Sequence, residues 1–279
     1  MGGGMNDIAL TGIPRGGTTL ACRLLAQCAD TLALAEPMRM DALPTERDAA
    51  VDAVAAFFGD VRKQVREHGR APAKLVEGGI GDNFFGDADS RGHRPLVARE
   101  GHVAFQPAGG YTLAIKHNAG FLALLPELAA RMPVVALVRH PLPVLASWQT
   151  VDLPVRDGHV PAGERFDAVL RARLQGIPDA LTRQLVVLDW CYARIANGVP
   201  PGNVVTYEAM IASGGQPLYE ACGIAGTPRP LEDRNASAHY RDRDPARLAA
   251  ALADFGGSWS QFYDKDDDAH ALARLQVTA

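Results

Sequence analysis

Five short apolar runs without helical spacing limit what this chain can fold into. The runs cover Asp7–Thr11, Thr31–Ala35, Tyr111–Lys116, Pro133–Val138 and Asn203–Tyr207. Segments with helical spacing lie between them. The run PVVALV at 133–138 is apolar on both faces, which is typical of a central parallel strand covered by helices on either side. This alternation predicts an α/β fold: a doubly wound, mainly parallel sheet of about five strands with helices on both faces.

Each helical segment between the runs has one apolar face. Apolar residues recur at helical spacing at Leu20, Leu24 and Cys28, again within Val51–Val65, and again within Leu185–Ile195. In a doubly wound sheet, ligands bind beyond the carboxyl ends of the strands. We therefore expect the functional residues directly after each run.

Composition indicates the class of protein. The chain has 279 residues, of which 47% are hydrophobic and 22% are charged, which is the balance of a globular protein rather than of a disordered chain. No repeat and no linker marks a boundary. We expect a single domain over residues 6–279 and a flexible lead over residues 1–5, which include three glycines.

Charge and hydropathy argue against several partners. The net charge is −4 and no run of Lys and Arg forms a cationic stripe, which argues against nucleic acid as a partner. No apolar stretch reaches the ~20 residues that span a bilayer, and the first residues lack the features of a secretion signal. The four cysteines form no CxxC pair, so we expect no disulfide and no structural zinc. These features predict a cytoplasmic protein without a membrane partner.

Two segments interrupt the alternation. Residues 78–110 contain too many glycines for a long helix and predict an irregular insertion. The insertion could be a lid over an acceptor site or a surface excursion without a binding role, and both interpretations stay open. The acidic stretch Asp264–Asp268 lacks the Gly and the later Glu of a calcium loop, so we expect a solvated patch there.

The strongest functional signal is a glycine-rich turn between the first apolar run and the first helical segment. Its residues are Gly12, Ile13, Pro14, Arg15, Gly16, Gly17, Thr18 and Thr19. A turn of small residues at the start of a helix presents backbone N–H groups and the positive helix end to an anion. The spacing is that of a phosphate-binding loop, but Thr-Thr replaces the Lys-Ser/Thr of an NTPase, and the cation is Arg15.

This turn resembles the first cofactor loop of the sulfotransferases that use 3′-phosphoadenosine 5′-phosphosulfate (PAPS), which has the form PxxGTT with Lys or Arg after the proline. A second motif of that family is a strand that ends in Arg, followed by a helix with Ser eight positions after the Arg. Here Arg139 ends the run 133–138 and Ser147 follows eight positions later (147 − 139 = 8). The resemblance implies a P-loop-like fold, PAPS as cofactor, adenosine 3′,5′-bisphosphate as product, and no metal. It also implies that Arg139 and Ser147 bind the 3′-phosphate of the nucleotide, for which a guanidinium and a hydroxyl are suited.

A third match is the segment VVTYE at 204–208, which is similar to the family segment whose Tyr lies near the adenine. The resemblance covers roughly residues 8–207, and Arg234–Ser237 (RNAS) is the candidate for the family's C-terminal cofactor segment. The cofactor-binding residues that the resemblance implies are Pro14, Arg15, Gly16, Gly17, Thr18, Thr19, Arg139, Ser147 and Tyr207.

Transfer of a sulfuryl group requires a base for the acceptor hydroxyl and a cation for the leaving phosphate oxygen, and Arg15 suits the second task. Glu36 lies 21 residues after Arg15 (36 − 15 = 21), in the strand-end context of the glutamate base of the protein-tyrosine sulfotransferases. His117 resembles the histidine of the cytosolic enzymes, although their pattern is Lys-Thr-His and here Lys116 and His117 are adjacent. Adjacent strand residues point to opposite faces, so His117 faces away if Lys116 faces the cofactor. We favour Glu36 as the base and keep His117 as the alternative.

These inferences predict a PAPS-dependent sulfotransferase that acts on a hydroxyl of a small molecule or of a peptide. A P-loop kinase is the first alternative, and the missing loop lysine and the pair Arg139 and Ser147 argue against it. A nucleotide-binding module without catalytic activity is the second alternative.

Overall fold

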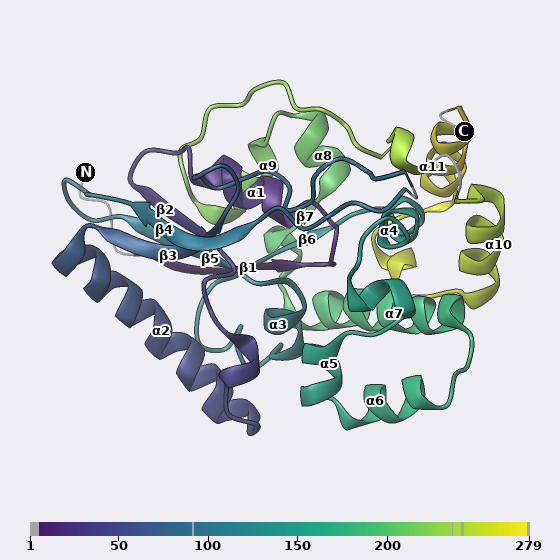
Figure 1. Cartoon of the computed structure of the whole chain (residues 1–279), viewed down its shortest axis with the longest axis horizontal. Helices are drawn as coiled ribbons and strands as arrows, with labels where there is room; N and C mark the ends of the chain where they lie inside the picture. The colour runs from purple at the N-terminus through teal and green to yellow at the C-terminus, as the bar shows by residue number, and fades with distance from the viewer. Residues whose placement is uncertain (1–5, 91, 236, 241–242, 278–279) are drawn as a thin grey trace.

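The computed structural model describes residues 6–90, 92–235, 237–240 and 243–277. At its centre lies a sheet of five strands, all parallel, in the order β2-β5-β1-β6-β7 (Figure 1). The strands are β1 (Asp7–Gly12), β2 (Thr31–Ala35), β5 (Thr112–Lys116), β6 (Val134–Val138) and β7 (Val204–Thr206). Helices cover both faces, so the predicted fold class, a doubly wound α/β sheet of P-loop-like kind, is confirmed. The lead at residues 1–5 lies outside the described residues.

Each predicted run forms one strand of this sheet, with shifts of one residue at several ends. Tyr111, Pro133 and Asn203 precede their strands, and Tyr207 begins a helix instead of ending β7. The parallel register pairs Leu10 of β1 with the last residue of β5, Lys116. The carboxyl ends of neighbouring strands therefore lie at one edge of the sheet.

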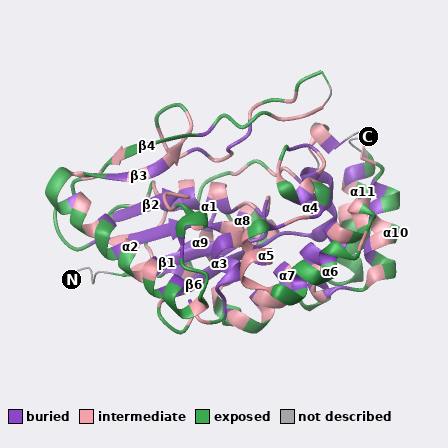
Figure 2. Cartoon of the chain, turned by 60° about the horizontal axis from the view of Figure 1, so that its bottom comes forward, coloured by how far each residue is buried: buried purple, intermediate pink, exposed green. Residues whose placement is uncertain are grey.

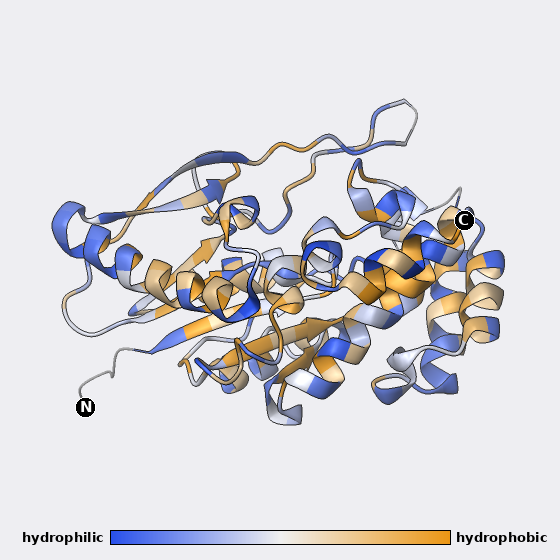
Figure 3. Ribbon diagram, turned by 90° about the horizontal axis from the view of Figure 1, so that it is seen from below, coloured by the Kyte–Doolittle hydropathy of each residue, from blue (hydrophilic) through white to orange (hydrophobic). Residues whose placement is uncertain are grey.

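Alternate residues of each strand divide between two hydrophobic clusters, one on each face of the sheet. In β5, Leu113 and Ile115 pack on the face covered by α2, α3, α4 and α7, whereas Ala114 packs on the face covered by α1, α8 and α9. Figure 3 shows the apolar strands between these layers. The helices are α1 (Thr18–Leu25), α2 (Arg47–His68), α3 (Asn118–Ala123), α4 (Pro141–Trp148), α5 (Pro161–Phe166), α6 (Ala168–Gln175), α7 (Ala180–Gly198), α8 (Tyr207–Ala212), α9 (Gln216–Cys222), α10 (Pro245–Phe255) and α11 (Lys265–Val277).

The predicted helical faces correspond to α1, α2 and α7. On the apolar face of α2, Val51, Val54, Phe58, Val61 and Val65 are buried, and Gly69 ends that helix in a left-handed conformation with φ of 62°. The first prediction extends too far, because α1 ends at Leu25 and Cys28 lies beyond it. Short 3₁₀ helices, η1 (Met40–Ala42), η2 (Pro154–Asp157), η3 (Pro201–Asn203), η4 (Ala238–Tyr240) and η5 (Ser258–Gln261), complete the elements.

A second, two-stranded sheet stands beside the main one. Its strands β3 (Arg70–Leu75) and β4 (Arg99–Ala104) pair antiparallel, and we call residues 70–104 the arm. The insertion predicted at 78–110 is thus irregular only in part, because β4 lies inside it, where side chains alternate between exposed and half-buried positions. The connection between the strands is held by the bridge between Phe85 and Leu96, and Figure 2 shows how far its outer part is exposed.

The four cysteines are free thiols. None of the helices in the described part of the chain combines the length and the apolarity that crossing a bilayer requires.

Candidate functional site

One large cavity, of about 1400 Å³, lies at the edge of the sheet where the parallel strands end. Every strand of the main sheet contributes a residue to it: Arg15 after β1, Glu36 after β2, Lys116 at the end of β5, Arg139 after β6 and Tyr207 after β7. The arm and the chain that follows α9 form the remaining walls. The topology therefore brings together residues that lie far apart in the sequence, at the place where doubly wound folds bind ligands.

The glycine-rich turn needs glycine at two positions because its backbone packs closely against β6 and the start of α8. Gly12 has a φ of 150°, and a Cβ there would lie 2.3 Å from the carbonyl oxygen of Leu137. Gly17 has a φ of 91°, and a Cβ there would lie 2.6 Å from the ring of Tyr207. A side chain of α4 also stabilises the turn, since Trp148 Nε1 donates to the carbonyl oxygen of Pro14 at 2.8 Å.

Several backbone N–H groups of this turn have no partner among the described residues. Outside the helices, no backbone hydrogen bond among the described residues uses the N–H of Arg15, Gly17, Thr18 or Thr19. Thr18 and Thr19 form the first turn of α1, where a helix leaves its N–H groups unpaired. These groups lie at the positive end of the helix and suit an anion. Gly16 instead donates to the carbonyl oxygen of Ile13.

Arg15 lies in a strained conformation, with a φ of 69° that residues other than glycine rarely adopt. Its Nε donates to Ser147 Oγ at 3.1 Å and its Nη1 to Asn83 Oδ1 at 3.0 Å. The guanidinium stacks on the ring of Phe85 with 4.8 Å to the centroid. Burial lowers the pKa of Arg15 to about 10, and neighbouring arginines lower it as well. Positive charge is therefore concentrated around this side chain.

Arg139 is buried, with 4% of its surface exposed, and joins two parts of the site. Its Nη1 donates to the carbonyl oxygen of Arg15 at 3.0 Å. Its Nε donates to Asn235 Oδ1 at 2.7 Å, and its Nη2 to the carbonyl oxygen of Arg234 at 2.8 Å. Its guanidinium also lies over the ring of Tyr207, whose hydroxyl accepts from the N–H of Arg234.

Neither of these two guanidiniums has a carboxylate partner. Among the described residues, no Asp or Glu oxygen lies within ion-pair distance of Arg15 or Arg139. Their hydrogen bonds instead go to amide, carbonyl and hydroxyl oxygens, which are neutral. The region around Arg15, Arg139 and Ser147, which we call the arginine end, thus holds buried positive charge that the described residues leave without an ion pair.

Ser147 and Arg139 lie together, as their spacing around the strand end requires, but only Arg139 lines the cavity. Ser147 is 1% exposed, its Oγ accepts from Arg15 Nε, and the hydroxyl of Tyr240 lies beside it. That hydroxyl also lies 3.5 Å from Arg139 Nη2. Tyr240 belongs to η4, more than 90 residues further along the chain, and no motif of the sequence pointed to it.

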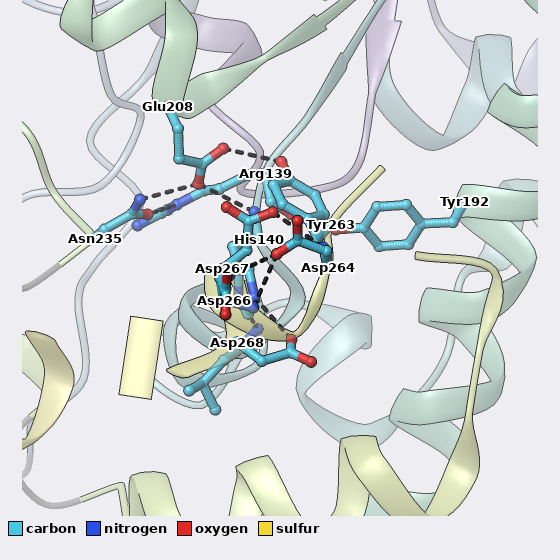
Figure 4. Close-up of polar contacts among 11 residues, drawn as sticks. Arg139, His140, Tyr192, Glu208, Asn235, Tyr263, Asp264, Asp266, Asp267 and Asp268 are labelled. Atoms are coloured by element: carbon cyan, nitrogen blue, oxygen red, sulfur yellow. Dashed lines mark hydrogen bonds and ion pairs between the residues drawn. The ribbon is translucent and has the colours of Figure 1, made fainter. Parts of the chain in front are cut away.

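A polar network behind the arginine end fixes its parts (Figure 4). The carboxylate of Glu208 accepts from the backbone N–H of His140 at 3.1 Å, from Asn235 Nδ2 at 2.9 Å and from the hydroxyl of Tyr263 at 2.9 Å. His140 Nδ1 accepts the N–H of Leu142 at the start of α4, and its Nε2 lies 3.1 Å from Asp268 Oδ1. This network attaches α4, α8 and α11 to one another.

The acidic stretch Asp264–Asp268 is therefore more than the solvated patch that its composition predicts. Asp264 Oδ1 accepts from the N–H of Asp266 and of Asp267, which closes the start of α11. Carboxylates at a helix amino terminus are stabilising, which explains the local excess of Asp without a ligand.

Glu36 lies between two lysines at the opposite side of the cavity. Its Oε1 is 2.6 Å from Lys116 Nζ and its Oε2 is 2.8 Å from Lys74 Nζ. Burial alone would raise the pKa of Glu36, but the two ammonium groups outweigh burial and hold the pKa well below its usual range. Lys116 is 1% exposed and lies over the ring of Phe84, with 4.9 Å to the centroid. We call Glu36, Lys74 and Lys116 the lysine end.

Lys74 enters the site from the arm, and sequence reasoning missed it. It lies on β3, in the segment RAPAKL, where buried and less buried positions alternate at first. Nothing in that segment indicates which residue Lys74 contacts. Glu36 has a left-handed backbone with φ of 48°, which shows that the surrounding structure constrains this position.

His117 occupies a different environment from Glu36. Its Nε2 accepts the backbone N–H of Met38 at 3.2 Å, and its ring packs on Phe121 with 5.3 Å between centroids. Burial lowers the pKa of His117 to about 3, so the ring is neutral at physiological pH. Lys116 lines the cavity and His117 does not, as the alternation of strand side chains requires.

The structure brings most of the sequence-predicted residues to the cavity. The residues that line it are Pro14, Arg15, Gly17, Thr18, Thr19, Glu36, Arg139 and Tyr207. Gly16, Ser147 and His117 lie outside the lining. From the predicted C-terminal segment, Arg234 and Ser237 line the cavity, whereas Ala236 lies outside the described residues. Within the described part of the chain, no three His, Cys, Asp or Glu side chains form a group that could hold a metal ion.

Comparison with known proteins adds no relative to this picture: no protein-family model and no curated protein matches the chain.

Proposed function

We propose that this chain is a sulfotransferase that moves a sulfuryl group from PAPS to a hydroxyl of an acceptor, either a small molecule or a peptide. The observation that carries the proposal is the arginine end, where Arg15 and Arg139 are bonded to neutral oxygens only. An anionic ligand between these guanidiniums would receive charge-assisted hydrogen bonds, which are stronger than those the neutral oxygens make. PAPS carries two phosphates and a sulfate, and so offers anions to both the arginines and the turn.

The residues of the cavity suit such a nucleotide. The unpaired N–H groups of Gly17, Thr18 and Thr19 lie at the start of α1, where they would hold the 5′-phosphate. The ring of Tyr207 closes one side of the turn and borders the cavity, where it would contact the nucleotide. When bound, PAPS supplies the sulfuryl group and a phosphate leaving group. Arg15 would then stabilise the charge that develops on the leaving oxygen.

We assign the base to Glu36, because it lines the cavity and His117 does not. Its depressed pKa makes it a weak base while both lysines bind it, and a base works best with a pKa near the working pH. An anionic sulfuryl group near Lys116 would share the ammonium with Glu36 and raise the pKa of the carboxylate. The acceptor hydroxyl would then give its proton to Glu36 while its oxygen attacks sulfur.

The arm supplies an apolar wall beside the lysine end. Phe84, Leu96 and Val97 line the cavity, and Leu96 is half exposed. Phe84 also contacts Lys116, which places this wall next to Glu36. We therefore propose that the arm covers the acceptor and that the acceptor has an apolar part next to its hydroxyl.

A kinase would use the same turn differently. Thr18 stands where a P-loop kinase has its lysine, and its Oγ1 donates to Asn118 Oδ1 at 2.7 Å. Titration calorimetry with adenosine 3′,5′-bisphosphate, AMP and ATP separates the alternatives. We expect at least tenfold tighter binding of the bisphosphate, because only it carries a 3′-phosphate. Tighter binding of ATP with magnesium would indicate a kinase, and binding of the bisphosphate without turnover of any hydroxyl compound would indicate a binding module.

A further inference from the structure

The hydroxyl of Tyr240 lies where the cationic groups of the arginine end converge. It lies beside Ser147 and 3.5 Å from Arg139 Nη2. Tyr240 is 4% exposed and still borders the cavity, so its ring stands between the protein interior and the ligand space. The hydroxyl oxygen of Tyr240 thus occupies the place where the motif of Arg139 and Ser147 predicts a phosphate oxygen.

Charge around Tyr240 is that of an anion site. Burial alone would raise the pKa of its phenol, but Arg139, Ser147 and Arg15 outweigh burial and lower it. Arg15 and Arg139 have no carboxylate partner among the described residues. The phenol oxygen of Tyr240 therefore takes, in part, the place of an anion beside them.

The contact between Arg139 and Tyr240 is the weakest of the hydrogen bonds that Arg139 makes. The bonds to Asn235, Arg15 and Arg234 have lengths of 2.7 to 3.0 Å, whereas the one to Tyr240 is 3.5 Å. A hydrogen bond of that length contributes little. Arg139 can therefore exchange Tyr240 for a better acceptor and keep the bonds that attach it to the turn and to the segment after α9.

Tyr240 belongs to a short element, and its ring packs in the hydrophobic core while its hydroxyl reaches the arginine end. It ends η4, a single turn of 3₁₀ helix that packs on α4. The anchors of the preceding segment, Arg234 and Asn235, are bonded separately to Tyr207 and Glu208. Displacement of Tyr240 leaves those anchors in place.

We infer that Tyr240 is an internal competitor for the phosphate subsite of Arg139, Ser147 and Arg15, and that a nucleotide with a 3′-phosphate binds by displacing its hydroxyl. This inference rests on the proposed nucleotide site. Nucleotides without a 3′-phosphate leave Tyr240 in place and gain nothing from this subsite. The competition weakens the binding of PAPS and of its nucleotide product alike, so it favours release of the product.

Calorimetry of the variant Tyr240→Phe tests the inference, because the variant keeps the ring and removes the competing oxygen. We expect adenosine 3′,5′-bisphosphate to bind about threefold tighter than to the wild type, because the contact with Arg139 that the variant removes is weak. The affinity for AMP should stay unchanged. The matched control is Tyr111→Phe, since the buried hydroxyl of Tyr111 has no hydrogen-bond partner among the described residues, and Tyr111 precedes β5 at the opposite edge of the sheet.

Hydrogen exchange of the wild-type protein gives a second readout that needs no variant. The bisphosphate should increase exchange in the peptide that contains Tyr240, whereas AMP should not. Weaker or unchanged binding of the bisphosphate by Tyr240→Phe, or slower exchange of that peptide, would show that Tyr240 is a ligand or a structural residue and would overturn the inference.

Failure of the proposed function looks different, because it appears in the wild type as equal affinity for the bisphosphate and AMP. In that case sulfate ion serves as the probe of the subsite. Tighter binding of sulfate by Tyr240→Phe would support the competition without the nucleotide, and equal binding would overturn it.

Discussion

The two ends of the cavity bury positive charge in opposite ways. At the lysine end, Lys74 and Lys116 share the carboxylate of Glu36 at 2.8 and 2.6 Å. At the arginine end, Arg15 and Arg139 have neutral oxygens as their partners among the described residues. The lysine end therefore contains a counter-ion of its own, one carboxylate for two ammonium groups, whereas we propose that an anion from outside completes the arginine end. In the proposed function, the nucleotide binds at the arginine end and the acceptor reacts at the lysine end.

The largest effect should follow from Glu36→Gln, which makes the lysine end resemble the arginine end. Without the basic oxygen, we expect turnover of PAPS with a hydroxyl acceptor to fall ~10²–10⁴-fold, while the affinity for adenosine 3′,5′-bisphosphate stays near that of the wild type. Lys116 would also lose its counter-ion, so the free energy of unfolding should fall by about 3 kcal/mol. Steady-state turnover, calorimetry and urea denaturation measure these three quantities.

The matched control for Glu36→Gln is His117→Gln, in which the amide oxygen can accept the N–H of Met38 in place of Nε2. Its turnover should stay near that of the wild type. If His117→Gln loses turnover and Glu36→Gln does not, the base is His117 and the lysine end has a structural role. If both lose it, the two residues act as a coupled pair, and only a ternary complex would divide their roles.

Sequence reasoning predicted the parts of this comparison that depend on local pattern. The apolar runs and the glycine turn lie within short segments, and parallel topology then brings Arg15, Glu36 and Arg139 to one edge. The strand inside the insertion was missed because glycines dominate residues 78–110, and its pairing with β3 depends on a partner some 30 residues away.

The contacts that complete each end could not be predicted from the sequence. Lys74 reaches Glu36 from a different sheet, and Asn235 and Tyr240 reach Arg139 across roughly 100 residues. A lone Lys, Asn or Tyr carries no pattern, because its role depends on the tertiary fold rather than on neighbours in the chain. The segment RNAS was suspected for its place in the family, yet the role of Asn235 as a partner of Arg139 came only from the structure.

A second prediction adds to the comparison a buried group that carries no charge in the folded protein at neutral pH, the ring of His117. The pKa of His117 is about 3 in the folded protein because the ring is buried, whereas in the unfolded chain it is near 6.5. The unfolded state therefore binds a proton first, and the stability that the neutral ring contributes above pH 6.5 is lost as the pH falls towards 3. By pH 5 the loss should be about 2 kcal/mol.

Urea denaturation at pH 7.5 and pH 5 measures that loss. The variant His117→Gln does not titrate, so its free energy of unfolding should fall by about 2 kcal/mol less than that of the wild type over this interval. The carboxylate of Glu36 remains ionised over the same interval and contributes equally to both proteins. Parallel pH curves for the two proteins would contradict the assignment of a buried, neutral His117.

The third prediction gives the arginine end the carboxylate it lacks. In Asn83→Asp, an oxygen that already lies 3.0 Å from Arg15 Nη1 becomes anionic. We expect about tenfold weaker binding of adenosine 3′,5′-bisphosphate, together with a higher melting temperature of the protein without ligand. Asn197→Asp, which adds the same charge at an exposed position in the last turn of α7, is the control for affinity and should leave the binding of the bisphosphate unchanged. Unchanged affinity in Asn83→Asp would show that Arg15 does not face the nucleotide.

The smallest effect is expected from removal of metal ions, and it tests whether the guanidiniums at the arginine end neutralise the nucleotide by themselves. A P-loop kinase needs magnesium because the transferred phosphoryl group carries more negative charge than a sulfuryl group. Arg15, Arg139 and the unpaired N–H groups of the turn together offer charge and donors for the phosphates without a divalent cation. Excess EDTA should therefore leave both the affinity for the bisphosphate and the turnover of PAPS within twofold of their values with magnesium. Loss of turnover that magnesium restores would contradict this charge balance and would favour the kinase, whereas loss of turnover with unchanged affinity would place a metal requirement at the lysine end instead.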